Sequence, residues 1–575
     1  MSYQLMFQKA VELQQKGALN EAEQIYRQIL QTAPDNADIL NLLGLIAQSR
    51  GIHNEAADYF YKALKNAPKH FPIYFNLAVS LGAMGHYTEA VEAYQKVLEI
   101  NGRCKEAYLG LGNIYWAQNK NDEAKQSFAK ALSIDADYVE AKTNLAELGD
   151  DTDTLKSISA NNPQALYYLG RRSFNERDFV QAEFYLKQAD ELIDDDEIKT
   201  MLGETLLSQN KSASALQKFY QALQINKHNV NALINVADME ALNGNFAEAE
   251  KYYKKTIEID VNNLRAHTNY ANMLCQNKRT LEALEEYRQA VIISPQSPEL
   301  SYNLSLILKS LEEYEAALDL MFHAFYLDSS REEWSLNIAE TLIMFNEKAP
   351  QKAKKICENW YEKMPDNLVV KHLWATLNQQ SDKEEKEYNR LLFDNFAPTY
   401  EKTLKNINYG VADKIADIYA PLNGNILDLG CGTGLLGEKI KNIDNRIFGV
   451  DISAEMLVIA ATKGIYADLY NQDIETFLQA NRHKFDYVTA ADVFCYFGDL
   501  EKIIKAVYPA PLIFSIESDE SCDKFLLQAN GRYKHNPQYI KSILQEVGYT
   551  TIKETPLVLR KENGKDVQGM IFAGF

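Results

Sequence analysis

Small and aromatic residues recur along the first two-thirds of the chain at a fixed interval. A small residue appears every 34 positions, in the series Gly44, Ala78, Gly112 and Ala146. An aromatic residue lies 16 positions after each of the first three, as Phe60, Tyr94 and Phe128. A repeat of this length predicts stacked helical hairpins, because small residues let two helices approach closely and the rings fill the space to the next hairpin.

The same register resumes at Gly170 and continues to Ala339, after an interruption near residues 150–162. The pattern resembles the tetratricopeptide repeat. We therefore expect an all-α superhelix over residues 1–380, with about ten repeats. The helical segment "NLVVKHLWATLNQQ" is expected to cap the last repeat.

Asparagine occupies position six of the first helix in several repeats, and four consecutive cases are Asn235, Asn269, Asn303 and Asn337. Stacking would align these amides, and an amide can donate to and accept from a peptide backbone. The pattern is similar to the asparagine ladder in the repeat superhelix of O-GlcNAc transferase, which implies a concave face that binds peptides. Hydrogen bonding between repeats is the alternative role for these amides.

After a charged segment the pattern changes to alternating strands and helices. Apolar runs that predict strands lie at 426–430, 447–450, 485–490, 511–516, 549–553 and 567–573, with helical patterns at 411–420, 453–463, 498–507 and 537–547. This alternation predicts a mainly parallel sheet covered on both faces. We expect a linker at 381–392 and an α/β Rossmann-like domain at 393–575.

The stretch "ILDLGCGTGLLG" at 426–437 runs from the first strand into a helix, which is where such sheets bind nucleotides. It also satisfies GxGxxG, so a dinucleotide is one alternative. Asp451 ends the second strand and could hold the ribose hydroxyls of either cofactor. Asp428 instead favours a cationic ligand. Its charge would repel the pyrophosphate of a dinucleotide but suits a ligand with an ammonium and a sulfonium.

The segment from Asp428 to Gly434 resembles motif I of class I S-adenosylmethionine-dependent methyltransferases. The segments "LLFDNFAPTYEKTL", "FDYVTAADVFCYFGDLEKII" and "GRYKHNPQYIKSILQEVGY" resemble predicted methyltransferases that carry tetratricopeptide repeats. The resemblance implies S-adenosylmethionine as cofactor. It implies backbone contacts to the methionine part at Gly430, Gly432 and Gly434, with Asp428 at its ammonium. It places the ribose at Asp451 and Ile452, and the adenine amine at Asp473 with Ile474 beside the ring.

Further residues are candidates for cofactor contact or catalysis, but the sequence patterns that suggest them are less specific. Met456 could contact adenine, and Tyr400 and Tyr409 could cover the cofactor, although core packing explains all three equally well. Asp492 and Tyr496 follow the fourth strand at the expected substrate edge and are the first catalytic candidates, and Asp492 is also a candidate for orienting the cofactor. His535 is a candidate base, with a capping or tethering role as its alternative. Glu517 is a further residue that could touch the substrate.

The net charge and the cysteines limit which ligands and which cellular compartment are expected for the protein. The net charge is −20, and neither region offers the basic field that nucleic-acid binding needs. Six cysteines without a CxxC pair predict reduced thiols in a cytoplasm and no metal site. The apolar runs are too short to span a membrane, and the N-terminus is typical of an amphipathic helix, not of a signal peptide.

The sequence thus favours a cytoplasmic methyltransferase whose repeats recruit a protein or peptide acceptor. Two alternatives stay open at this stage. One is a small-molecule methyltransferase that its repeats tether to an assembly. The other is a repeat scaffold whose cofactor site is idle. The stretch after the fourth strand lacks the Asn/Asp-Pro-Pro-aromatic motif, which lowers the case for amide or exocyclic-amine methylation.

Overall fold

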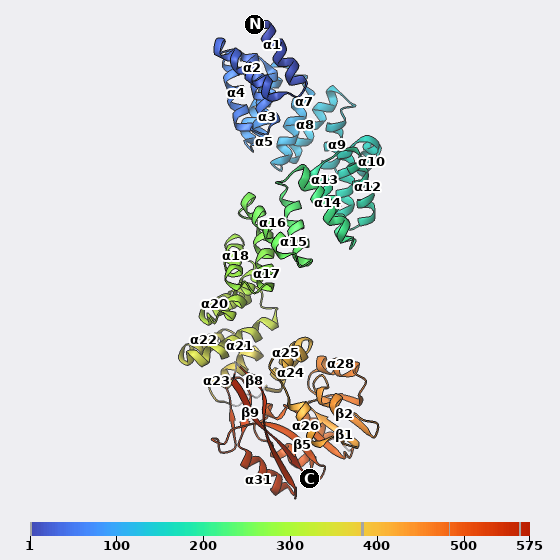
Figure 1. Cartoon of the computed structure of the whole chain (residues 1–575), viewed down its shortest axis with the longest axis vertical. Helices are drawn as coiled ribbons and strands as arrows, with labels where there is room; N and C mark the ends of the chain where they lie inside the picture. The colour runs from blue at the N-terminus through green and yellow to red at the C-terminus, as the bar shows by residue number, and fades with distance from the viewer. Residues whose placement is uncertain (1–2, 381–384, 482, 563–564) are drawn as a thin grey trace. The chain divides into compact units, whose positions relative to one another are not determined.

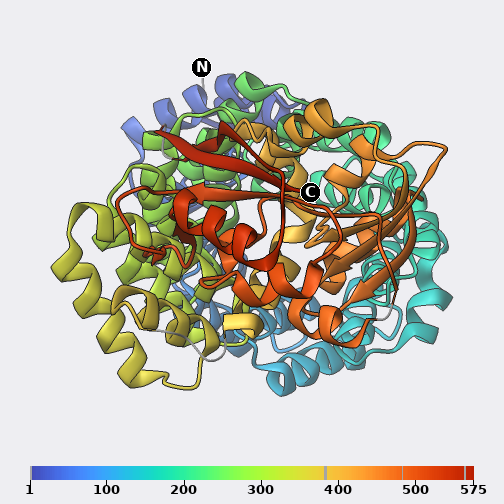
Figure 2. The same ribbon diagram turned by 90° about the horizontal axis from the view of Figure 1, so that it is seen from below.

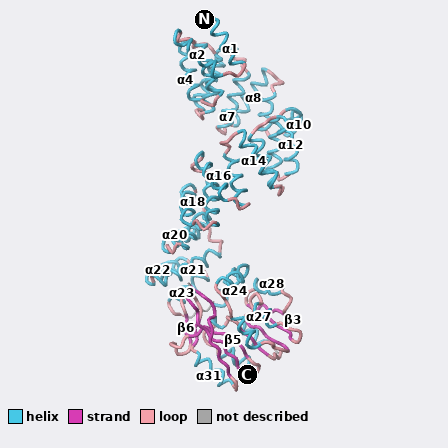
Figure 3. The backbone as a smooth tube through the Cα atoms, in the orientation of Figure 1, coloured by secondary structure: helices cyan, strands magenta, loops and turns pink. Residues whose placement is uncertain are grey.

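The computed structural model describes residues 3–380, 385–481, 483–562 and 565–575. The chain forms two compact units, Met1–Ala266 and His267–Phe575. Among the described residues, the regular elements of the first unit are all helices, and strands occur only in the C-terminal part of the second unit (Figure 3). No helix in the described part of the chain is both long and apolar enough to cross a membrane.

The first unit is built from antiparallel helix pairs (Figure 1). The first helices of the pairs are α1 (Tyr3–Gln15), α3 (Ala37–Ser49), α5 (Phe71–Ala83), α7 (Lys105–Ala117), α9 (Val139–Leu148), α11 (Pro163–Asn175), α13 (Asp196–Ser208) and α15 (Val230–Leu242). The second helices are α2 (Leu19–Thr32), α4 (His53–Asn66), α6 (Tyr87–Ile100), α8 (Asn121–Ile134), α10 (Thr152–Ile158), α12 (Phe179–Leu192), α14 (Ser212–Ile225) and α16 (Phe246–Ile259).

The small residues of the repeat are required by close packing within each pair. A Cβ added at Gly44 would lie 2.4 Å from the ring of Phe60, and one at Gly112 would lie 2.3 Å from Phe128. No real side chain tolerates such distances, so the glycine and the aromatic ring fill one space between two helices. The predicted tetratricopeptide architecture is confirmed.

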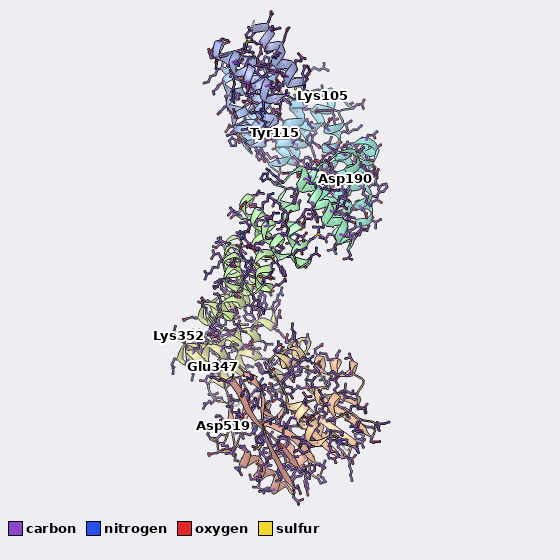
Figure 4. The ribbon with its side chains drawn as sticks, viewed as in Figure 1. Lys105, Tyr115, Asp190, Glu347, Lys352 and Asp519 are labelled. Carbon is purple, nitrogen blue, oxygen red and sulfur yellow. The ribbon has the colours of Figure 1, made fainter. Side chains whose placement is uncertain are left out.

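The expected interruption is a shortened pair. Helix α10 has 7 residues, and the short 3-10 turn η1 (Ser159–Asn161) follows it before α11 begins. The Asp151 side chain caps α10, and the Asn162 side chain caps α11. Beyond this point ionic contacts join successive helices: Asp190, labelled in Figure 4, pairs with Lys199 of α13 and Lys218 of α14.

The second unit starts with the remaining helix pairs. They are α17 (Leu264–Gln276, which begins at the end of the first unit), α18 (Thr280–Ile293), α19 (Pro298–Ser310), α20 (Tyr314–Leu327), α21 (Glu332–Lys348) and α22 (Pro350–Lys363), followed by the single helix α23 (Leu368–Leu377). Trp334, Trp360, Val370 and Leu373 share one buried cluster. Helix α23 therefore packs on the last pair, as its apolar pattern predicts.

The region expected as a linker is partly helical. Residues 381–384 lie outside the described residues, but α24 spans Glu385–Phe396. In this helix the charged residues Lys386, Glu387 and Arg390 are exposed, whereas Tyr388 is buried. The boundaries at 380 and 393 remain predictions, and the compact unit that holds them begins at His267.

The C-terminal part is a nine-stranded, mainly parallel sheet with the order β3-β2-β1-β4-β5-β7-β6, in which β9 pairs antiparallel with β5 and β8. Its strands are β1 (Gly424–Leu429), β2 (Asn445–Asp451), β3 (Tyr466–Asn471), β4 (Tyr487–Ala490), β5 (Leu512–Ser518), β6 (Phe525–Leu527), β7 (Tyr533–His535), β8 (Ile552–Glu562) and β9 (Lys565–Gly574). The predicted α/β fold class is confirmed.

Three helical segments precede β1: η2 (Ala397–Thr399), α25 (Tyr400–Asn406) and α26 (Val411–Tyr419). The helical segments between the strands are α27 (Leu435–Ile440), α28 (Ala454–Thr462), α29 (Ile474–Ala480), η3 (Phe494–Tyr496), α30 (Glu501–Val507) and α31 (Pro537–Val547). Two buried clusters cover the sheet, one around Leu427 and Phe514 and the other around Ile426 and Ile513. Since neighbouring residues of a strand point to opposite faces, both faces of the sheet are buried.

Two features of the sheet differ from the expectation. The strand expected at 549–553 is β8 at Ile552–Glu562, which runs beside β9 (the red strands of Figure 2). Its polar residues and Pro556 hide the alternation in the sequence. The strands β6 and β7, each 3 residues long, were not predicted because so short a run carries no periodic signal.

Candidate functional site

The loop after β1 depends on glycine. Gly430, Gly432 and Gly434 have φ angles of +61°, +52° and +87°, which favour glycine. A Cβ at Gly430 would lie 2.3 Å from the side chain of Val493. The sequence thus folds here into a tight turn whose bare backbone faces the carboxyl ends of the strands, and α27 starts directly after it.

A cavity of about 370 Å³ opens at this edge of the sheet. Ten of the residues singled out from the sequence line it: Tyr400, Gly430, Gly432, Asp451, Ile452, Met456, Asp473, Ile474, Asp492 and Tyr496. A recess of about 20 Å³ shares Tyr400, Gly430 and Gly432 with the cavity and adds Tyr409 and Asp428. Gly434 lines neither the cavity nor the recess. A Cβ added at this position would contact Tyr466.

Asp451 joins the glycine loop to the end of β2. Its two carboxylate oxygens accept hydrogen bonds from the backbone N–H groups of Gly432 (2.8 Å) and Ser453 (2.9 Å). The side chain is 8% exposed, and this burial raises its pKa from 3.8 to about 6. Each oxygen keeps a lone pair, so the carboxylate can still accept hydroxyl groups from a ligand.

Asp428 is more deeply buried than Asp451. Its carboxylate accepts hydrogen bonds from the Tyr466 hydroxyl (2.8 Å) and the Thr489 hydroxyl (3.0 Å). Burial raises its pKa from 3.8 to about 6. Two carboxylates that burial makes less acidic thus flank the glycine loop, and a cation bound beside them would favour their ionised forms.

Asp473 also lines the cavity and caps α29, accepting from the Thr476 N–H at 3.1 Å. Lys386 donates to the same oxygen at 2.7 Å. Although burial opposes them, the bonds from Lys386 and Thr476 hold the pKa of Asp473 below its ordinary value. Ile474 and Met456 are buried beside it and form the apolar wall that a purine ring requires.

The charges that line the cavity decide which cofactor fits. They comprise the carboxylates Glu385, Asp451, Asp473, Glu475, Asp492 and Asp499, against the two lysines Lys386 and Lys502. Lys386 is already paired with Asp473 and Glu475. Arginine is absent from the described lining residues. This excess of negative charge fits a positively charged ligand and disfavours a diphosphate.

Family models match both parts of the chain. The tetratricopeptide repeat models cover residues 7–71, 75–139 and 206–273, and the methyltransferase domain model covers residues 427–510. The chain carries tetratricopeptide repeats and a methyltransferase domain. The second match contains the glycine loop, Asp451, Asp473 and Asp492, which are the residues that the cavity brings together.

Curated relatives of the methyltransferase domain are distant. The ubiquinone biosynthesis O-methyltransferase of Sodalis glossinidius (strain morsitans) is 30% identical over 110 residues, which are 18% of this chain and 44% of the relative. The putative methyltransferase YqeM of Bacillus subtilis (strain 168) is 32% identical over 73 residues, 13% of this chain and 30% of the relative. The chain thus spans less than half the length of these relatives.

A similar solved structure is that of MamA, which is 21% identical and matches 28% of this chain and 96% of its own, at a TM-score of 0.25. A similarity this low adds nothing to the fold already described.

Asp492, which lines the cavity, is held by a buried arginine. Its carboxylate lies 3.0 and 3.2 Å from Nη1 of Arg560, which is 1% exposed and also pairs with Glu517 and Glu562. Burial raises the pKa of Asp492, and the Arg560 charge opposes this rise. Asp492 also has a φ of +56°, and its N–H donates to the Ser515 hydroxyl at 2.8 Å.

His535 does not reach the cavity. It is fully buried, and its Nε2 lies 3.0 Å from the carbonyl oxygens of both Phe497 and Gly498, so this nitrogen carries the proton and donates it. Burial lowers its pKa. The structure therefore supports the tethering role for His535 and gives no geometric support to the base role.

Glu517 is likewise absent from the lining of the cavity and of the recess. It is 2% exposed and pairs with Arg560 and Gln528. Tyr400 lines both the cavity and the recess, and Tyr409 lines the recess. Burial raises the pKa of both tyrosine hydroxyls, so they serve as walls and hydrogen-bond donors at neutral pH.

Sequence reasoning missed the wall of the cavity that α24 provides. Glu385, Lys386, Asn389 and Phe393 line it with the spacing of one helical face. Phe393 also packs edge-to-face on Tyr496, with ring centroids 5.2 Å apart. The apolar and polar spacing within 385–396 was the available signal, but the charged composition suggested a linker.

The asparagines of the repeats bond mainly to protein. Asn235 is 3% exposed; its amide donates to Glu204 at 3.0 Å and its oxygen accepts from Arg265 at 2.9 Å. Asn337 donates to the Glu333 carbonyl at 3.0 Å. These contacts match the alternative of hydrogen bonding within and between repeats. Asn269 and Asn303 are partly exposed, so their role in peptide binding remains a prediction.

Proposed function

We propose that this chain transfers a methyl group from S-adenosylmethionine to a protein or peptide that its repeats recruit. The observation that carries the proposal is the charge around the glycine loop: Asp451 and an excess of carboxylates line the cavity, and the buried Asp428 lines the adjoining recess. When bound, this cofactor supplies an electrophilic methyl group on a sulfonium.

The residues of the chain then bind and align. The backbone at Gly430 and Gly432 allows the methionine part to approach, and Asp428 offers a negative charge to its ammonium. Asp451 accepts from the ribose hydroxyls, and Asp473 accepts from the adenine amine through its second oxygen. Such alignment is the main catalytic contribution that an in-line displacement needs from the protein.

Asp492 is the group that we assign to the acceptor. Arg560 fixes its carboxylate at the cavity wall, and Tyr496 stands beside it. A carboxyl whose pKa is raised by burial can accept a hydrogen bond from the attacking atom and orient its lone pair towards the methyl group. No histidine lines the cavity among the described residues, so Asp492 is the ionisable group best placed for this task.

A groove in the first unit supports a peptide acceptor. It has a volume of about 830 Å³ and lies where the shortened pair interrupts the repeat, between α7, α9 and α11. The Asn144 amide donates to the Asn113 oxygen at 2.8 Å, which leaves the Asn113 amide as a donor and the Asn144 oxygen as an acceptor. A peptide group offers the complementary pair, and Trp116 and Tyr168 supply an apolar wall for a side chain.

The names of the curated relatives favour a second candidate. Several are ubiquinone biosynthesis O-methyltransferases, so a small-molecule hydroxyl is the alternative acceptor. Under this alternative the repeats only hold the enzyme in an assembly.

Transfer of label from radioactive S-adenosylmethionine into a cell extract separates these candidates. Label in the protein fraction, lost with Asp451→Ala, is the expected result. Label only in small molecules would favour the second candidate. No labelling together with no binding of the cofactor would show that the chain is a scaffold and would refute the proposal.

A further inference from the structure

Helix α24 takes part in two different regions of the second unit. One face carries Lys386, Asn389 and Phe393, which line the cofactor cavity. The other face carries Tyr388, which is buried, and Leu391 and Leu392, which pack against the cluster of the last helix pair and α23. A displacement of this helix would therefore disturb both the cavity wall and the end of the repeat array.

The cavity face is attached through Lys386. Its ammonium lies 2.7 Å from Asp473 and 2.8 Å from Glu475, across the end of the cavity that we assign to adenine. Both Lys386 and the Thr476 N–H bind the same oxygen of Asp473, so its other oxygen is left for a ligand. Lys386 thus fixes the orientation of the carboxylate that would read the adenine amine.

The array face is attached through an aromatic stack. The Tyr388 ring lies parallel to His372 of α23, with centroids 3.8 Å apart and an interplanar angle of 13°. Tyr388 is 8% exposed and His372 is 4% exposed. The turn between β6 and β7 packs on His372 as well, since a Cβ at Gly531 would lie 2.5 Å from its Nε2.

At its C-terminal end, α24 is attached to the methyltransferase domain by Asp394. This carboxylate accepts from the Ser453 hydroxyl at 2.7 Å, at the start of α28. Towards the N-terminal end of α24, Lys386 pairs with Asp473 and Glu475, and Tyr388 stacks on His372. These contacts hold the first turn of the helix.

We propose that Lys386 is a positioning residue that closes the first turn of α24 over the adenine end of the cavity, and that the Tyr388–His372 stack couples this closure to the last repeat. The inference rests on the proposed function, because it needs the cofactor to occupy this cavity. By linkage, a partner that orders α23 strengthens cofactor binding, and the cofactor orders α23.

The first test compares Lys386→Met with Lys402→Met, an exposed lysine on α25. S-adenosylhomocysteine, the product form of the cofactor, is the probe in stopped-flow and calorimetric measurements. We expect Lys386→Met to speed dissociation about fivefold, which is the upper range for a partly exposed ion pair. Lys402→Met should leave the rate unchanged. Equal rates for Lys386→Met and the native chain would overturn the proposal.

Hydrogen exchange measures the coupling between the cavity and α23 directly. A purely structural role of Lys386 would not change the protection that the ligand gives to α23. In the native chain S-adenosylhomocysteine should slow exchange in the glycine loop, in α24 and in α23. In Lys386→Met the protection should persist in the glycine loop and vanish in α23 and the first turn of α24.

The outcomes of the exchange experiment separate the two proposals. Protection of the glycine loop without any change in α24 and α23 would overturn the coupling and leave the proposed function standing. Failure of the native chain to bind S-adenosylhomocysteine at all would overturn the proposed function and this inference with it. Since the Lys386 side chain is half exposed, Lys386→Met should fold normally, and thermal unfolding checks this.

Discussion

Replacing Asp451 by asparagine changes the charge of the cavity and little of its shape. The carboxylate accepts hydrogen bonds from Gly432 and Ser453 through two different oxygens. An asparagine keeps one acceptor and turns an NH₂ group towards the other N–H. Two donors then face each other, so one of the two hydrogen bonds is lost. It is either the bond to Gly432 in the glycine loop or the bond to Ser453 at the start of α28.

Two effects follow from this geometry. Loss of a hydrogen bond from a ribose hydroxyl to a charged acceptor costs about 1.5 to 3 kcal/mol, which weakens binding by about 10- to 150-fold. The unpaired donor within the protein lowers the free energy of unfolding by about 1 to 3 kcal/mol. The asparagine carries no buried charge, which offsets part of the second effect because burial already disfavours the charge of Asp451.

Calorimetric titration with S-adenosylhomocysteine measures the first effect, and thermal unfolding measures the second. Asp468→Asn is the matched control, since Asp468 is exposed on β3. It should change neither quantity. If Asp451→Asn bound within threefold of the native chain, the assignment of Asp451 to the ribose would be refuted.

Four further predictions concern the methyltransferase domain. Because burial raises the pKa of Asp428 and Asp451 to about 6, both carboxylates lose charge as pH falls through 6; S-adenosylmethionine affinity should therefore fall between pH 7 and pH 5, measured by calorimetry. With no ligand these two groups bind protons more readily in the folded than in the unfolded chain, so their contribution to stability should grow as pH falls from 6 towards 4, seen by chemical denaturation. Gly430→Ala places a Cβ 2.3 Å from Val493 at a φ of +61°, and it should abolish cofactor binding in the same titration; retained affinity would show that the loop adapts. His535→Asn should lower the melting temperature and leave the pH profile of kcat unchanged, because the ring donates to buried carbonyls; a lost pH limb would restore the base role.

The sequence alone predicted those parts of the fold that repeat or alternate. The spacing from Gly44 to Phe60 recurs because the two helices of successive pairs pack against each other in the same way, so one period describes most of the helix pairs in the described part of the chain. The glycine loop was equally visible, since its positive φ angles leave few alternatives to glycine.

The contacts that hold the site in place could not be predicted in the same way. Arg560 reaches Asp492 from 68 positions away, and Lys386 reaches Asp473 from 87 positions away. Such pairs depend on the register of strands and on the placement of α24, for which local sequence carries no signal. His535 was ambiguous for the same reason, because its two carbonyl partners lie 37 and 38 residues away.

The most direct test of the account is calorimetric titration of the native chain with S-adenosylmethionine and, in a separate experiment, with NAD. The cavity is lined by six carboxylates and two lysines, so we predict saturable binding of the sulfonium compound and no measurable binding of the dinucleotide. Tight binding of NAD with no heat from S-adenosylmethionine would contradict the account.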